Sequence, residues 1–130
     1  MPLHFRIDRE AEIVWTWAEG TVTADDLVEH ARALTKTPDR PRWELADFSD
    51  RAEIPVATET VRAVAGLLSR EDVNRPGSRL ALVAGNEAMF GMLRLFEAYR
   101  EHSNVEICVF RDREEALRWL ADRPPAGDVR

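Results

Sequence analysis

The sequence has little cysteine and lysine, and it has no long hydrophobic run. Cys108 is the only cysteine in 130 residues, so no internal disulfide can form, and a reducing cytoplasm is the expected location. Lys36 is the only lysine, and the net charge of −6 argues against a general nucleic-acid-binding surface. No apolar stretch approaches the roughly 20 residues that span a bilayer, and the first residues lack the pattern of a signal peptide. We therefore expect no nucleic-acid partner and no stable membrane insertion.

Motifs that carry catalysis or bind cofactors are also missing. The six glycines form no glycine-rich phosphate loop, and no cluster of side chains has the spacing of a metal site. The sequence shows no acid–base partner for His4, His30 or His102, so structural roles are expected for all three. Nothing pairs a nucleophile with a base. These observations favour a protein that is not an enzyme, with no catalytic residue, cofactor or metal.

Two short apolar runs with a helical segment between them dominate the second half of the chain. Leu80–Ala84 and Val105–Phe110 are the runs, and the helix is predicted from Asn86 to about His102. This order is typical of parallel strands that are buried on both faces and joined by a right-handed crossover. Asp112 then opens a last helix, with Glu115 three residues later as in a capping box.

The first half of the chain predicts a hairpin followed by two helix–strand units. The hairpin strands are His4–Ile7 and Ile13–Trp17, and Thr23 with Asp26 forms a capping-box pattern for the first helix. Trp43–Phe48 reads as the third strand and Ala57–Ser69 as the second helix. The complete order is β-β-α-β-α-β-α-β-α. It indicates an α/β fold with a mixed, mostly parallel sheet, an antiparallel N-terminal strand and four helices. We expect a single domain over residues 1–122 and a disordered tail over residues 123–130.

Three segments resemble a known superfamily. Leu45–Ser49 looks like the strand end Asp-Leu-Ser of STAS domains, Arg79–Val83 looks like the core strand that follows, and Val109–Leu120 looks like the closing strand and helix of SpoIIAA-like proteins. Taken together, residues 5–120 resemble the SpoIIAA-like superfamily, which includes STAS domains and Sec14/CRAL-TRIO-like small bacterial domains. The resemblance implies a SpoIIAA-like fold and a bacterial, non-enzymatic regulatory or protein-interaction module.

The chain departs from this family at the start of the second helix. In anti-sigma-factor antagonists, a serine at this point is phosphorylated by a partner kinase. Here Ile54–Thr58 contains no serine and no glycine, and Thr58 is the only hydroxyl near the right place. The resemblance therefore does not carry the phosphorylation switch over to this chain.

A polar loop is expected beyond the carboxyl ends of the core strands, where open α/β sheets place ligands. Its candidate residues are Asp47, Ser49, Asp50, Thr58 and Asn86. A cation among the aspartates, or an anion at the helix start marked by Asn86, is one interpretation. The alternative is a solvated loop whose side chains bond the local backbone, with Asn86 as an ordinary helix cap.

The third helix is apolar on nearly every side. One face is expected to pack on the sheet, which leaves Phe90, Leu95 and Tyr99 without an obvious place in a single copy of the chain. The first hypothesis is therefore an interaction module that forms a homodimer or binds a regulatory protein through these residues. A second hypothesis is a carrier of a small apolar or lipid-like ligand, in a Sec14-like pocket lined by the second and third helices. The remaining alternative is that long flanking side chains or the C-terminal tail cover this face.

Overall fold

A computed structural model describes residues 2–49, 52–71 and 77–122 of the chain. The strands are β1 (Leu3–Asp8), β2 (Ile13–Ala18), β3 (Gly20–Thr21), β4 (Trp43–Phe48), β5 (Ala52–Glu53), β6 (Ser78–Ala84) and β7 (Val105–Phe110). The helices are α1 (Ala24–Thr35), α2 (Thr58–Glu71), α3 (Glu87–Tyr99) and α4 (Arg113–Ala121). The disordered tail predicted for residues 123–130 lies outside the described residues.

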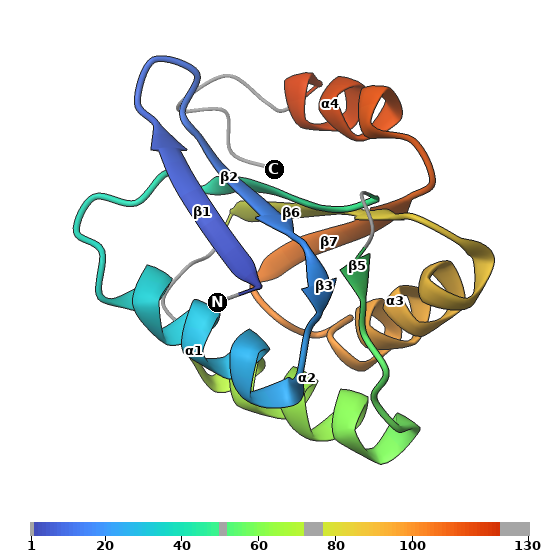
Figure 1. Cartoon of the computed structure of the whole chain (residues 1–130). Helices are drawn as coiled ribbons and strands as arrows, with labels where there is room; N and C mark the ends of the chain where they lie inside the picture. The colour runs from blue at the N-terminus through green and yellow to red at the C-terminus, as the bar shows by residue number, and fades with distance from the viewer. Residues whose placement is uncertain (1, 50–51, 72–76, 123–130) are drawn as a thin grey trace.

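Five strands form the main sheet in the order β1-β2-β4-β6-β7 (Figure 1). The predicted hairpin is present, because β1 and β2 pair antiparallel with Leu3 opposite Ala18 and Asp8 opposite Ile13. The other three pairings are parallel, including β6 with β7, where Ser78 lies opposite Val105. The prediction of a mixed, mostly parallel sheet is thus confirmed. A second, two-stranded sheet of β3 and β5 was not expected, because two-residue strands leave no periodicity in a sequence.

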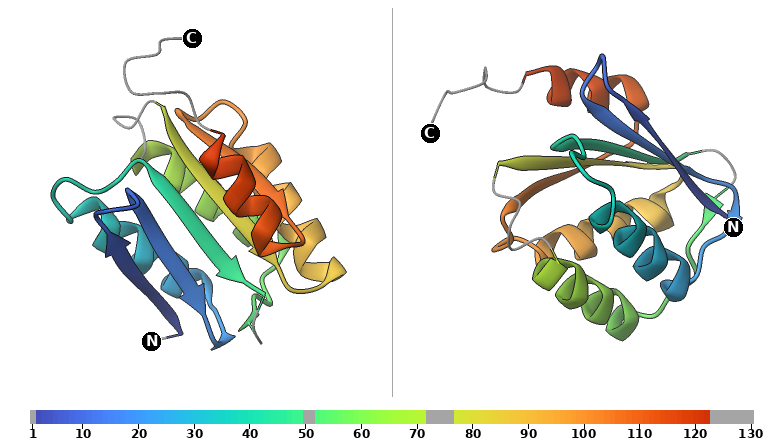
Figure 2. Two further views of the ribbon diagram at one scale, coloured as in Figure 1. Left: turned by 90° about the horizontal axis from the view of Figure 1, so that it is seen from above. Right: turned by 90° about the vertical axis from the view of Figure 1, so that its left-hand side faces the viewer.

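The helices form two layers of unequal size. Each crossover from β2 to β4, β6 and β7 moves in the same direction across the sheet, and right-handed crossovers then place α1, α2 and α3 on one face. The right-hand view of Figure 2 shows these three helices beneath the sheet and α4 alone above it. There α4 contacts β4, β6 and β7.

Alternation along the strands builds a separate core on each face. On β6, Leu82 and Ala84 belong to the cluster between the sheet and α1, α2 and α3. Ala81 and Val83 belong to the cluster between the sheet and α4. A strand buried on both faces needs apolar residues at consecutive positions, which explains the continuous apolar run in this segment.

Local signals set where the helices begin. The predicted capping box of α1 is present: Asp26 N donates to Thr23 Oγ1 at 3.1 Å, and Thr23 N donates to Asp26 Oδ2 at 2.9 Å. Asp112 caps α4 by accepting from Glu114 N at 2.8 Å. The third helix is shorter than predicted, because the chain turns at residues 100–104, where Ser103 N donates to Arg100 O at 3.0 Å.

A candidate ligand cavity beneath the sheet

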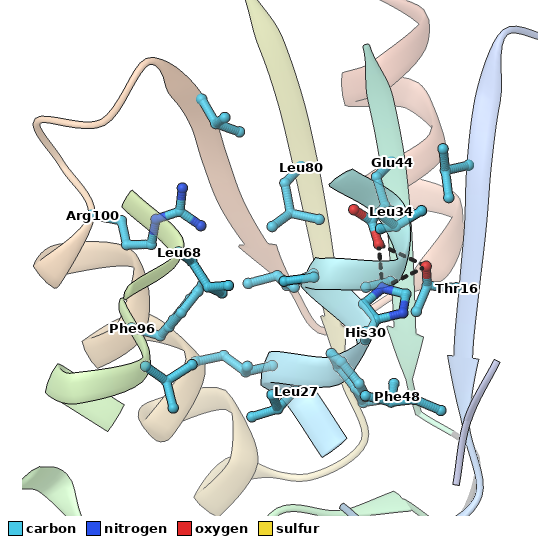
Figure 3. A pocket seen from close by; sticks show the side chains of 18 of the residues that line it. Thr16, Leu27, His30, Leu34, Glu44, Phe48, Leu68, Leu80, Phe96 and Arg100 are labelled. Carbon is cyan, nitrogen blue, oxygen red and sulfur yellow. Dashed lines mark hydrogen bonds and ion pairs between the residues drawn. The ribbon is translucent and has the colours of Figure 1, made fainter. Parts of the chain in front are cut away.

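A cavity of about 140 Å³ lies between the sheet and the layer of α1, α2 and α3. Its apolar walls come from all three helices, from strands of the sheet that include β4, β6 and β7, and from the segment before α2 (Figure 3). They include Leu27, Leu34, Ala46, Phe48, Ile54, Val56, Val61, Val64, Leu68, Leu80, Leu82, Met92, Leu93, Phe96 and Val105. A mostly apolar cavity with a few polar groups is the usual character of a small-molecule site.

The cavity reaches the surface where α1 ends and the strands begin. Thr35 and Arg42 both line the cavity and are exposed, so this end is open to solvent. It lies at the amino ends of β4, β6 and β7. The site is therefore at the opposite edge of the sheet from the polar loop that the sequence suggested.

Three polar side chains meet at one side of the cavity. Thr16 on β2 donates from Oγ1 to Glu44 Oε2 at 2.6 Å, and His30 Nε2 on α1 lies 3.1 Å from the same oxygen. Figure 3 shows the three pointing toward one another across the joint between α1 and the sheet. The expectation that His30 has no acid–base partner is thus wrong, since Glu44 is that partner.

The surroundings of Glu44 favour its ionised form. Burial by itself raises the pKa of this carboxyl, but hydrogen bonds from His30 and Thr16, together with the charges of His30 and Arg40, outweigh burial and lower the pKa below its ordinary value. The side chains of His30 and Glu44 are only 14% and 20% exposed, so the pair is held largely away from water. The cluster is a fixed polar spot in an otherwise apolar wall.

Two more polar groups lie at the open end of the cavity. Ser78 begins β6, is 4% exposed, and its buried Oγ has no hydrogen-bond partner within residues 2–49, 52–71 and 77–122. Arg100 follows α3 and is 3% exposed, with its Cζ 5.5 Å from the centre of the Phe96 ring. Figure 3 places Arg100 and Phe96 across the cavity from Glu44 and His30. A buried hydroxyl without a partner is costly, and in a cavity it is available to a ligand.

The loop residues suggested by the sequence make local contacts. Ser49 donates from both its backbone N and its Oγ to Asp47 Oδ1, and Asp47 Oδ2 lies 3.9 Å from Arg113 Nη1. Asn86 caps α3 by accepting from Met89 N at 2.8 Å. Thr58 is the exposed first residue of α2, and Asp50 lies outside the described residues. Within the described ranges, no group of three or more His, Cys, Asp or Glu side chains could hold a metal ion.

The α3 residues suggested as an interaction surface are partly covered by their own chain. Phe90, Leu95 and Tyr99 each pack against the core with part of the side chain exposed. The Cζ of Arg111 lies 3.7 Å from the centre of the Phe90 ring, and the Cζ of Arg62 lies 5.2 Å from the centre of the Tyr99 ring. Flanking arginines of the same chain thus cover part of Phe90 and of Tyr99, which is the kind of contact that the alternative of flanking side chains describes. The role of the three residues in self-association stays a prediction.

Comparison with known proteins identifies a solved structure with a similar fold. No protein-family model matches the chain, and no curated protein matches it. A solved structure from Shewanella loihica PV-4, an uncharacterised protein of the DUF3478 family described as having a SpoIIAA-like fold, is similar over 91% of this chain and 93% of its own. The two share 21% sequence identity and a TM-score of 0.56. This chain has a SpoIIAA-like fold. That confirms the architecture implied by the three sequence segments, and at this identity the likeness concerns the fold alone. Among the residues described, no helix is long and apolar enough to cross a membrane.

Sequence reasoning missed the polar residues of the cavity, although part of the signal was present. His30 stands three residues after Leu27 and four before Leu34, on the apolar stripe of α1. Glu44 interrupts β4 at the position that faces the same helix. A histidine and a carboxylate, both at inward positions of neighbouring elements, predict a buried pair. Ser78 and Arg100 carried no comparable signal, because both stand at the ends of elements.

Proposed function

We propose that this SpoIIAA-like chain binds a small apolar molecule in the cavity beneath its sheet. The observation that carries the proposal is the cavity itself, about 140 Å³ between β4, β6 and the three helices on that face. Protein interiors are normally packed with few voids larger than a water molecule. A larger apolar cavity that opens to solvent costs stability, and binding a ligand recovers the lost contacts.

A matched pair of substitutions on α1 tests this proposal. Ala31 lines the cavity, whereas Ala33 lies on the exposed side of the same helix. Ala31→Leu adds three carbons to the cavity, and Ala33→Leu adds the same atoms to the surface. We expect 1-octanol to raise the melting temperature of the wild type and of Ala33→Leu, and to have little effect on Ala31→Leu. Equal responses of the two variants, or no response of the wild type to 1-octanol, would count against a ligand in this cavity.

A protein-interaction module that forms a homodimer remains the second candidate. What favours it is the outward side of α3, where Ala88, Gly91 and Ala98 are exposed beside the partly exposed Leu95. Ala88, Gly91 and Ala98 themselves carry no charge and are small, so a second copy could approach the helix closely there. Its test, by oligomeric state, is given among the predictions below.

A further inference from the structure

We infer that the ligand is a small carboxylic acid of about ten non-hydrogen atoms, with its carboxylate at Ser78 and Arg100 and its apolar part among the walls of α1, α2 and α3. The inference rests on the proposed function, because it concerns the same cavity, and it adds the chemical class and size of the ligand.

The size follows from the volume of the cavity. A cavity of about 150 Å³ holds a molecule the size of benzene. The 140 Å³ here therefore holds roughly six or seven carbons of an apolar part, and an acid group at the open end brings the ligand to about ten non-hydrogen atoms. An eight-carbon fatty acid or an arylalkanoic acid has this size. A lipid with two acyl chains is several times larger.

The charge follows from the residues around the cavity. Among the described residues, its lining contains the arginines Arg40, Arg42 and Arg100 and one carboxylate, Glu44. The lining is thus richer in guanidinium groups than in carboxylates, although all three arginines also have contacts within the chain. A fourth arginine of the lining, Arg79, is engaged on the other face of the sheet, where it donates to Glu106 and to Trp119 O. The cavity therefore favours an anion over a neutral or cationic ligand.

The position of the carboxylate follows from the two buried polar side chains at the open end. Ser78 lies on the strand face that carries Leu80 and Leu82, so its hydroxyl faces the cavity. A short turn leads from Arg100 to Val105, which is the pairing partner of Ser78, and this brings Arg100 to the same end. The Ser78 O–H can donate to one carboxylate oxygen. A guanidinium has five N–H donors, so Arg100 can bind the other oxygen beside its existing contacts.

The chemistry also selects a carboxylate over a phosphate group. Two carboxylate oxygens match the donors of one serine and one arginine. A phosphate monoester brings more oxygens and close to two negative charges at neutral pH, which one serine hydroxyl and one guanidinium match less well. On the other side of the cavity, Glu44 with Thr16 and His30 keeps a second anion away. The ligand is thus expected to lie with its acid outward, toward Arg42 and solvent, and its apolar end inward.

Calorimetric titration with octanoate and with 1-octanol tests the inference, because the two differ mainly in the acid group. We expect octanoate to bind the wild type at least about tenfold more tightly than 1-octanol. Ser78→Ala and Arg100→Gln should each weaken octanoate binding by about tenfold and leave the affinity for 1-octanol unchanged. Ser69→Ala on α2 and Arg94→Gln on α3 are matched controls that lie outside the lining and should change neither affinity.

The outcomes separate this inference from the proposed function. If 1-octanol binds as tightly as octanoate, or if Ser78→Ala leaves the preference intact, the carboxylate assignment is wrong while binding in the cavity stands. If neither probe binds, both proposals fail. Tighter binding of dioctanoyl phosphatidylcholine than of octanoate would overturn the size. Should Arg100→Gln fail to fold, Ser78→Ala still decides, since it removes a buried hydroxyl that has no hydrogen-bond partner among the described residues.

Discussion

His30 on α1 donates from Nε2 to Glu44 Oε2 on β4 across 3.1 Å, and this contact joins the helix layer to the sheet beside the cavity. The hydroxyl of Thr16 donates to the same oxygen, so one carboxylate connects β2, β4 and α1. Because Glu44 Oε2 accepts from both His30 and Thr16, this carboxylate oxygen has its hydrogen bonds satisfied despite its burial. The cluster therefore helps to keep α1 at a fixed distance from the sheet while the neighbouring space stays open.

The stability contributed by Glu44 should depend on pH. Because the folded state lowers the pKa of Glu44, its contribution is fully present above the ordinary glutamate pKa of 4.5 and is lost as the pH falls through the lowered pKa. We expect Glu44→Gln to reduce the free energy of unfolding by about 1–3 kcal/mol near neutral pH. Urea denaturation at about pH 7 and about pH 3 measures whether the difference from the wild type shrinks on acidification.

Glu106→Gln is the control for this measurement. Glu106 pairs with Arg79, but its side chain is 59% exposed, so its loss should cost about 1 kcal/mol or less. A Glu44→Gln penalty that is no larger than this, or that grows toward acid pH, would contradict the role assigned to the buried cluster.

Two glycines should respond to alanine in opposite ways. A Cβ at Gly85, between β6 and α3, would lie 3.0 Å from Ser49 O and 3.1 Å from Phe48 O, whereas a Cβ at Gly66 within α2 meets nothing within 4 Å. Gly66→Ala should raise the free energy of unfolding by about 0.5–1 kcal/mol, because alanine is the better helix former. Gly85→Ala should lower it, because backbone atoms of the β4 end must move. Thermal unfolding of both variants checks the signs, and a stabilised Gly85→Ala would show that this approach is not tight.

The homodimer hypothesis makes a prediction about Leu95. If the outward side of α3 is a dimer interface, Leu95→Glu buries a charge without a partner and should convert a dimer to a monomer. Arg94→Ala on the neighbouring exposed position is the control. Sedimentation velocity of the wild type and both variants measures the mass. A wild type that stays monomeric at the highest concentration reached would remove this candidate function.

Cys108 should react slowly in the folded protein. Burial is the main cause that raises the pKa of its thiol, and the charge of Glu97 adds to it. The reactive thiolate is thus scarce near neutral pH. Because this is the only cysteine, alkylation by iodoacetamide reports on one site. We expect the folded protein to be modified much more slowly than the urea-unfolded chain, and equal rates would mean that β7 is open to solvent on the face of α4.

Much of the fold was predictable because its signals are local. The continuous apolar run from Leu80 to Ala84 indicates a strand buried on both faces, and the Thr23–Asp26 capping box marks where α1 begins. The sequence suggested a candidate site at the carboxyl edge of the sheet, whereas the cavity opens at the amino edge. Asp47 and Asn86 follow a known rule for open α/β sheets, but in the structure they bond to neighbouring residues.

The sequence by itself determined the order of the main-sheet strands and of the helices, and the apolar faces that each presents. Periodicity and capping carry this information because they depend on residues within a few positions of one another. Only the tertiary structure decided that Glu44 meets His30, that Ser78 and Arg100 share one end of a cavity, and that Arg111 covers Phe90. These contacts join residues from separate elements, and the space left between the helix layer and the sheet depends on how their side chains fit together. No local pattern encodes that fit.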